Sequence, residues 1–351
     1  MTISLCMIVK NEEKVLDRCL KSIKDLFDEI VIVDTGSNDN TIKIAQKYTN
    51  KIFYFCWCDN FSKARNYAIK NATSEYIFWL DADDIMPYET YRYIKSIKDK
   101  LTSDVYMLKY NIAFKDNKPT FSFYRERIIK NCDKCYFSGC VHECITPFGK
   151  VEKLNCSIDH KKENFKISNR NLKIYQKTIK QRPLNARELY YYARELFDHK
   201  KYKMSITYLK KFINTNQGWI ENIIDAYYLM SKCYLFLGNL SKQFECLTKT
   251  FLYDKPRANV CCAIGDYFLY KKNYQTAKYW YTLATQCEDV TKKGGFCEPL
   301  FYNYYPYLQL CVCCYNLGNI KEANNCNEMA GKFLNSEIVK KNREFFISQK
   351  N

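Results

Sequence analysis

Three acidic residues follow a short apolar run in the first quarter of the chain. Residues 76–80 are rich in aromatic and branched side chains, which is typical of a buried strand, and Asp81, Asp83 and Asp84 come directly after them. Because burying unpaired carboxylates is costly, we expect these acids where the strand ends and the chain turns towards solvent. Carboxylates in such a place can hold Mg²⁺ or Mn²⁺ together with substrate phosphates. A polar turn that only caps the next helix is the alternative.

The first third of the sequence alternates apolar runs with helical patterns. We predict strands over 3–9, 29–33, 51–55, 76–80, 105–111 and 127–130, and helices over 13–23, 41–48 and 61–71. Strands separated by helices of this length indicate βαβ crossovers and a mainly parallel sheet. Ligands of such open sheets bind beyond the carboxyl ends of the strands. Asp34 and Asp81 both follow apolar strands, so both are predicted at this edge.

From about residue 169 onwards the pattern is helical throughout. Four polar turns join pairs of predicted helices, at residues 199–202, 237–240, 271–274 and 317–320. A small residue lies one helical turn before each of them: Ala193, Ser231, Gly265 and Cys311. Their spacings of 38, 34 and 46 positions are close to the repeat of a tetratricopeptide unit, about 34 residues. Residues 187–335 therefore resemble tetratricopeptide repeats with an insertion around 289–299; an irregular helical bundle is the alternative.

The composition limits the classes of protein and partner. Lys and Arg outnumber Asp and Glu by 55 to 38, a formal net charge of +17, which favours anionic partners such as phosphorylated donors, nucleic acid or an acidic surface. The 19 cysteines occur without a secretory signal, so we expect reduced thiols in the cytoplasm. No apolar run reaches the roughly 18 residues of a membrane span, so none is predicted.

Four segments of the first 85 residues resemble, in this order, the motifs of glycosyltransferase family 2. They are residues 9–13 (VKNEE), 30–39 (IVIVDTGSND), 60–66 (NFSKARN) and 79–84 (WLDADD). The resemblance covers roughly residues 1–160 and implies the GT-A fold, an α/β fold that binds nucleotide-sugars. The repeats add a resemblance to a subgroup in which a Gly-x-Val-His-Glu element follows, and residues 139–143 match it.

The resemblance assigns five residues to the donor. Asp34 would accept the base N–H of the nucleotide, which favours uracil, and Asn11 and Glu13 would close a turn near the base and ribose. Arg65 would contact phosphate or base oxygens, because a guanidinium forks and stays charged. Asp81 would meet the ribose or a metal-bound water. On the residues alone, Asp34 could instead cap its own turn, and Arg65 could lie on a solvated helix face.

Residues 81–83 match the Asp-x-Asp element that such enzymes use for a divalent metal, Mn²⁺ or Mg²⁺. By resemblance, Asp83 would ligate the metal, with Asp81 beside it. Side chains two apart in an extended segment point to opposite faces, so the two acids need not share one task. His160 is a candidate third ligand, and a lone surface histidine is its alternative.

Transfer of a sugar also needs a base that takes the proton of the acceptor. We choose Glu143, because a carboxylate opposite the leaving group is the usual arrangement for inversion. Asp84 is the second candidate, and His142 and Asp133 are further alternatives.

A zinc site competes for part of the same segment. Cys132 and Cys135 have the spacing of a zinc-binding pair, and Cys140, His142 and Cys144 follow closely. Cysteine is so abundant in this chain that chance pairs are expected, which makes structural zinc the minor alternative.

The sequence thus predicts an α/β GT-A domain over residues 1–165, a linker helix over 166–186 and tetratricopeptide-like all-α repeats over 187–351. The expected activity is a metal-dependent, inverting transfer of a sugar from a UDP-sugar to a protein, peptide or glycan. The repeats would present the acceptor, bind a partner or form a homodimer. The alternative is a repeat scaffold with an inactive α/β domain. Nucleic-acid binding is disfavoured, because the tyrosines fall at helical spacing and no basic recognition motif occurs.

Overall fold

The protein divides into two compact units, residues 1–191 and 192–351. The computed structural model describes residues 1–23, 25–115, 118–161, 169–290 and 298–348. The division lies inside helix α6, Ala186–Asp198. The predicted domain boundaries after residues 165 and 186 stay predictions, because a division into compact units does not show which segments fold alone. Across the described ranges, no helix has both the length and the apolarity needed to cross a membrane.

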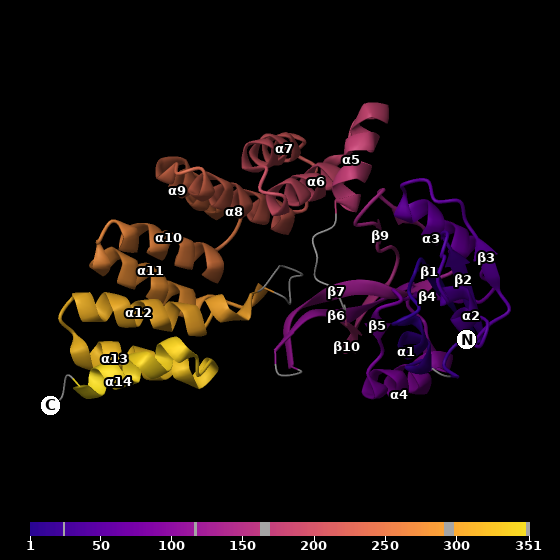
Figure 1. Cartoon of the computed structure of the whole chain (residues 1–351), viewed down its shortest axis with the longest axis horizontal. Helices are drawn as coiled ribbons and strands as arrows, with labels where there is room; N and C mark the ends of the chain where they lie inside the picture. Colours follow the sequence, from indigo (N-terminus) through magenta and orange to yellow (C-terminus); the bar gives the residue numbers. More distant parts are fainter. Residues whose placement is uncertain (24, 116–117, 162–168, 291–297, 349–351) are drawn as a thin grey trace. The chain divides into compact units, whose positions relative to one another are not determined.

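An eight-stranded mixed sheet with the order β3-β2-β1-β4-β7-β6-β10-β5 forms the core of the first unit. Its strands are β1 Ile3–Val9, β2 Glu29–Asp34, β3 Ile52–Tyr54, β4 Tyr76–Trp79, β5 Asp84–Ile85, β6 Val105–Lys115, β7 Lys118–Lys130 and β10 Val151–His160. Strands β1 to β4 are parallel to one another, as predicted. Strand β7 runs antiparallel to β4 and β6, and it forms with β6 a long hairpin that extends beyond the apolar runs visible in the sequence (Figure 1).

Helices cover both faces of this sheet. They are α1 Leu16–Lys21, α2 Thr41–Ala45, α3 Phe61–Lys70 and α4 Tyr88–Ile97, with the short η1 Lys98–Lys100 after α4. Leu5 of β1 and Phe78 of β4 belong to the core that α1 and α4 complete. Their neighbours Cys6 and Trp79 face the other core, with α3 and the small hairpin of β8 Phe137–Ser138 and β9 Cys144–Ile145. The period of two residues in the strands therefore sends Trp79 to the α3 side.

Helix α1 begins at Leu16, three residues later than predicted. Asn11 has a φ of +56°, and the Glu13 carboxylate accepts hydrogen bonds from the backbone N–H and the side-chain amide of Asn40, both at 3.0 Å. These long-range bonds hold residues 11–13 in a turn. The helix therefore starts only where apolar residues face the core.

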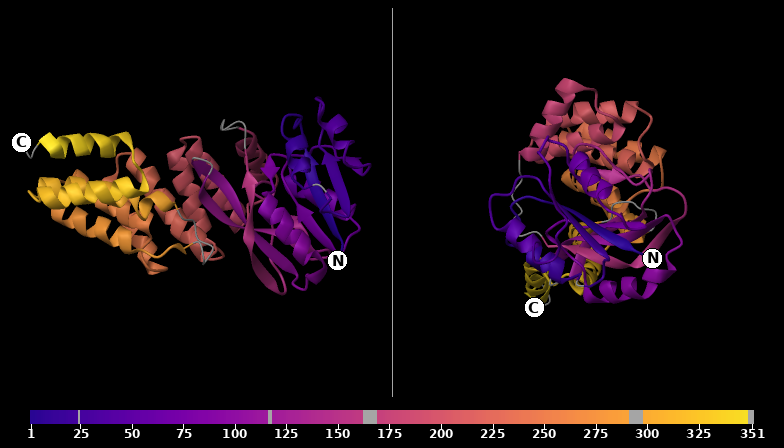
Figure 2. Two further views of the ribbon diagram at one scale, coloured as in Figure 1. Left: turned by 90° about the horizontal axis from the view of Figure 1, so that it is seen from below. Right: turned by 90° about the vertical axis from the view of Figure 1, so that its right-hand side faces the viewer.

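The second unit is a stack of antiparallel helices (Figures 1 and 2). Its elements after α6 are α7 Tyr202–Asn214, α8 Ile220–Phe236, α9 Leu240–Lys249, η2 Thr250–Leu252, α10 Ala258–Tyr270, α11 Tyr274–Gln286, η4 Pro299–Phe301, α12 Tyr304–Asn316, α13 Ile320–Phe333 and α14 Glu337–Ser348. The four predicted turns join α6 to α7, α8 to α9, α10 to α11 and α12 to α13, which confirms the tetratricopeptide-like repeats. Residues 291–297 of the predicted insertion lie outside the described residues.

All four turns end their first helix in the same way. Lys200, Gly238, Lys272 and Gly318 have positive φ values between 58° and 80°. The N–H of each following residue bonds to a carbonyl five positions earlier, as in Asn239 to Tyr234 at 2.9 Å. This is the Schellman motif, which satisfies the free carbonyls of a helix end. Two repeats use lysine where glycine would be less strained, and this weakens the sequence signal of the repeat.

The small residues before these turns are buried, as predicted for sites of close helix approach. Gly265 of α10 is the tightest example, because a Cβ added there would lie 2.6 Å from Cε1 of Tyr281. Tyr281 is fully buried in α11. Glycine therefore lets the α10 backbone pack directly on this ring.

We expect Gly265→Ala to lower the free energy of unfolding of the second unit by about 1–3 kcal/mol, because the new methyl group overpacks the buried ring. Gly331→Ala is the matched control: its Cβ meets Nη2 of Arg343 at 2.7 Å, a flexible side-chain end that can move away, and Cγ1 of Val339 at 3.0 Å, which needs to shift by only a few tenths of an ångström. Chemical denaturation of both variants measures the difference. Equal losses would contradict the packing explanation.

Candidate active site

A cleft of about 620 Å³ lies in the first unit at the carboxyl ends of β1 and β4. Residues from the turn after β1, from α3, from the end of β4, from the loop between β8 and β9 and from the end of β10 line it. The lining includes Glu12, Arg65, Asp81, Asp83, Glu143 and His160. Acidic side chains therefore gather at this edge of the sheet, as predicted.

Arg65 joins two of the acids. Its Nη2 lies 2.5 Å from Oδ1 of Asp81, and its Nε lies 2.5 Å from Oε1 of Glu143. Only 8% of Arg65 is exposed, so the solvated helix face considered for this residue is wrong. Burial alone would lower the pKa of Arg65, but the charges of Asp81 and Glu143 raise it above its ordinary value. The guanidinium is therefore a permanent positive charge in the cleft wall.

Asp84 lies beneath the cleft floor and is fully buried. It accepts hydrogen bonds from the Tyr110 hydroxyl at 2.8 Å, from Nη1 of Arg127 at 3.2 Å and from the backbone N–H of Asp81 at 3.0 Å. A carboxylate this enclosed has no surface for an acceptor, so this placement does not support Asp84 as the base. Arg127 was missed in the sequence, since a basic residue in a strand does not reveal a partner 43 positions away.

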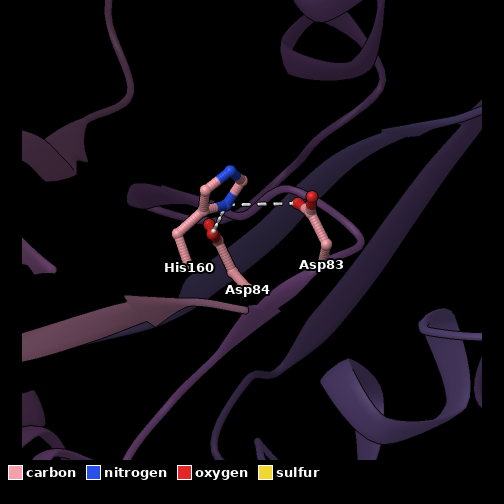
Figure 3. Close-up of side chains that lie close together, drawn as sticks. All are labelled: Asp83, Asp84 and His160. Carbon is pink, nitrogen blue, oxygen red and sulfur yellow. Dashed lines mark hydrogen bonds and ion pairs between the residues drawn. The ribbon is translucent and has the colours of Figure 1, made fainter. Parts of the chain in front are cut away.

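Asp83, Asp84 and His160 come together as a potential cation site (Figure 3). Their ligand atoms lie within 4.8 Å of one another, and Nδ1 of His160 is 3.3 Å from Asp83 and 3.1 Å from Asp84. The antiparallel pairing of β10 with β5 places His160 opposite Asp84. The alternative of a lone surface histidine is therefore wrong. Asp81, also predicted for the metal, pairs instead with Arg65.

The protonation equilibria of this group indicate an excess of negative charge. Burial raises the pKa of Asp83, and Asp81 and Asp84 raise it further against the effect of His160. Burial would lower the pKa of His160, but the hydrogen bond with Asp84 and the nearby carboxylates raise it. Two carboxylates and an imidazole are donors that suit Mn²⁺ or Mg²⁺.

The residues assigned to the donor base mostly shape the cleft. Asp34 accepts hydrogen bonds from the N–H groups of Gly36 and Ser37 at 3.1 Å, which is the turn-capping alternative. Asn11 accepts one from the N–H of Asn38 at 2.9 Å, and Glu13 holds Asn40. Asn11, Glu13 and Asp34 are not among the residues that line the cleft. Their contacts with a donor therefore stay predictions.

Glu12 is the acid that the sequence did not single out. It lines the cleft, and burial together with the charges of Asp83 and Asp81 raises its pKa to about 7. No periodic signal separates it from Asn11 and Glu13, because the strand pattern ends at Val9. Only the turn geometry decides which of the three side chains enters the cleft.

The cysteines of the segment 132–144 do not assemble a metal site. Cys132 is exposed while Cys135 and Cys140 are buried. Within the described ranges, Asp83, Asp84 and His160 form the only group of three or more potential ligands close enough to share an ion. The zinc alternative therefore has no support in this structure.

Comparison with known proteins identifies the domain that carries this cleft. Residues 4–149 match the family model described as glycosyl transferase family 2. These residues contain all four motifs found in the sequence and most of the cleft lining. The N-terminal domain is a family 2 glycosyltransferase domain.

Curated relatives of this glycosyltransferase domain come from several bacteria. The SPbeta prophage-derived glycosyltransferase SunS of Bacillus subtilis is 31% identical over 259 residues, which are 67% of this chain and 59% of SunS. The poly(ribitol-phosphate) beta-N-acetylglucosaminyltransferase TarS of Staphylococcus aureus is 30% identical over 37% of this chain and 26% of TarS. A TPR repeat-containing protein of Synechococcus elongatus is 45% identical over 28% of this chain and 24% of its own length. The chain thus spans about a quarter to three-fifths of these relatives.

Solved structures give weaker likenesses. Residues 1–349 of S. aureus TarS in complex with UDP align at 18% identity with a TM-score of 0.40, over 70% of this chain and 89% of that one. MamA aligns at 17% identity with a TM-score of 0.37, over 47% and 81%.

The raised pKa of Glu12 makes stability depend on pH in the metal-free protein. Between its ordinary value of 4.5 and its folded value of about 7, the folded state binds more protons than the unfolded state, so the free energy of unfolding falls as pH rises. The raised pKa of His160 acts in the same direction. We expect Glu12→Gln to make the free energy of unfolding fall less steeply with pH, measured by denaturation in EDTA at several pH values. An unchanged slope would contradict the raised pKa of Glu12.

Proposed function

We propose that this chain is a metal-dependent, inverting glycosyltransferase that moves a sugar from a UDP-sugar to a protein, peptide or glycan. One observation carries the proposal: a cation-binding group, a buried arginine and a separate carboxylate line one cleft of a family 2 glycosyltransferase domain. The names of SunS and TarS give the same class of reaction for those relatives. The uracil base rests on the resemblance of the Asp34 motif to the family.

Asp83 and His160 would hold the divalent cation from the cleft side, with Asp84 directly beneath them. A cation bound there offsets the charge that builds on the leaving nucleoside diphosphate. Asp83 and His160 face the cleft with side-chain exposures of 22% and 17%. Asp84 supports them from below, because Arg127 and Tyr110 fix its carboxylate.

Arg65 is positioned to bind the donor. Its Nη1 is buried and makes no hydrogen bond within the described part of the chain, while its other nitrogens hold Asp81 and Glu143. With every nitrogen either paired or buried, Arg65 would attract the phosphates of a bound UDP-sugar through its positive charge in the cleft wall.

Glu143 is the base that takes the acceptor proton. Arg65 anchors its Oε1, while no hydrogen bond to its Oε2 is recorded among the described residues. The carboxylate lines the cleft. One held oxygen and one free oxygen give a fixed orientation with a free site for an acceptor proton. Transfer then follows from attack of the deprotonated acceptor on the face of the sugar opposite to UDP.

The repeats would present the acceptor or bind a partner, and a homodimer is a further use of the same surfaces. The rival function is a repeat scaffold with an inactive α/β domain. A buried arginine with an unsatisfied N–H and a cluster of acids both lower the stability of the fold. A domain without activity would gain stability by losing them. This cost favours the enzyme over the scaffold.

Donor binding is tested by thermal unfolding with UDP-glucose and UDP-N-acetylglucosamine, each with Mn²⁺ and with EDTA. A ligand at a hundred times its Kd stabilises the folded state by about 2.7 kcal/mol. We expect stabilisation by at least one donor with Mn²⁺ and much less in EDTA or in the Asp83→Asn variant. Equal stabilisation by the donor with Mn²⁺, in EDTA and in the Asp83→Asn variant would refute the metal-dependent donor site.

The base is tested by Glu143→Gln. We expect a loss of about 10²–10⁴-fold in the transfer rate, since proton abstraction is removed, with UDP binding retained. Glu188→Gln is the matched control, because Glu188 is also buried and bonded by an arginine, Arg182 at 2.7 Å, but is not recorded in the cleft lining. If Glu143→Gln turned over as fast as the control, another group would be the base.

A further inference from the structure

Trp79 is the last residue of β4 and lies two positions before Asp81, the first of the three acids. Only 3% of it is exposed. Its indole N–H donates to the backbone carbonyl of Glu126 on β7 at 2.5 Å, so the ring has one fixed orientation. The sequence indicated no role for it beyond the buried strand.

Three arginines surround this indole. The Cζ atom of Arg127 lies 3.8 Å from the ring centroid, and those of Arg65 and Arg125 each lie 4.9 Å from it. Arg65 comes from α3, while the other two come from β7. A cation within about 6 Å of an indole face is attracted by the ring quadrupole.

Each of the three arginines also holds part of the site. Arg65 bonds to the carboxylates of Asp81 and Glu143. Arg127 bonds to the carboxylate of Asp84. Arg125 donates to the backbone carbonyl of Glu143 at 3.2 Å. The indole is thus the common neighbour of every guanidinium that positions Asp81, Asp84 and Glu143.

The hydrogen bonds of these arginines are incomplete. Nη1 of Arg65 and both Nε and Nη2 of Arg127 are buried without a hydrogen-bond partner in the described residues. Arg127 is fully buried and lies between the rings of Trp79 and Tyr110, 4.4 Å from the latter. Unpaired buried N–H groups and like charges are both costly. Aromatic faces are the remaining interaction that offsets this cost.

We propose that Trp79 is a positioning residue of this site, whose indole holds Arg65, Arg125 and Arg127 so that they fix the acidic groups of the cleft. The proposal rests on the proposed function for its effect on turnover, and on the cation site of Asp83, Asp84 and His160 for its effect on metal binding. The competing explanation is that Trp79 only fills space in the core.

Fluorinated tryptophans separate the two explanations. Each fluorine weakens the attraction of the ring for a cation while nearly preserving its shape. We expect kcat for hydrolysis of the preferred UDP-sugar to fall progressively, by about tenfold over a series from unsubstituted to trifluorinated tryptophan. The chain has four tryptophans, so the Trp79→Phe protein grown on the same analogues reports the effect of the other three. An equal decline in both proteins would overturn the proposal.

Metal binding is the readout that does not need turnover. We expect Trp79→Leu to weaken Mn²⁺ binding, followed by electron paramagnetic resonance, by at least tenfold, and Trp79→Phe to restore part of it. Phe78→Leu is the matched control, because Phe78 is the neighbouring buried strand residue and faces the other core. The proposal is overturned if Trp79→Leu and Phe78→Leu bind Mn²⁺ equally.

The two hypotheses fail in different ways. If the unaltered protein binds Mn²⁺ but neither binds nor hydrolyses any UDP-sugar, the proposed function fails, and the Mn²⁺ comparison still decides the role of Trp79. If it turns over a UDP-sugar and Trp79→Leu matches Phe78→Leu in both Mn²⁺ binding and kcat, only the role of Trp79 fails. A protein that does not bind Mn²⁺ overturns both.

Discussion

The ion pairs of Arg65 with Asp81 and Glu143 are the interaction on which the candidate site depends. They tie the end of a central strand to the loop between β8 and β9, in a place where Arg65 and Glu143 are largely removed from water and 31% of the Asp81 side chain stays exposed. Removing one member of a buried charged set leaves the others uncompensated, which typically costs about 3–5 kcal/mol. The same guanidinium therefore shapes the cleft, sets the orientation of Glu143 and adds a positive charge to the cleft wall.

The sheet makes this concentration of charge possible. Parallel strands bring the segments after β1 and β4 to one edge, and the antiparallel strand β7 delivers arginines beneath them. Asp84 and Arg127, both fully buried, form an ion pair there at 3.2 Å. Stability alone would favour apolar side chains at such positions. They lie at the carboxyl edge of the strands, under a cleft, which is where open α/β sheets bind their ligands.

The four repeats end their first helix and pack their helix pairs in the same way. A residue with positive φ ends each first helix, and a small buried residue one turn earlier lets the helices approach. The periodic small residues could be predicted, because close packing leaves a local mark on the sequence. The lysines with positive φ could not, since lysine has no preference for that conformation and is held there by the helix end itself.

Periodicity and motif order are local properties of the chain, and they were enough to predict the alternating strands, the helical repeats and the glycosyltransferase resemblance of the first domain. The sequence also placed Asp81 and Asp83 at the correct edge of the sheet. It did not determine that Arg65 meets Glu143, 78 positions away, or that His160 meets Asp84, 76 positions away. It also left open which of residues 11–13 enters the cleft. These contacts join distant segments, so they depend on strand order and turn geometry, which leave no periodic trace in the chain.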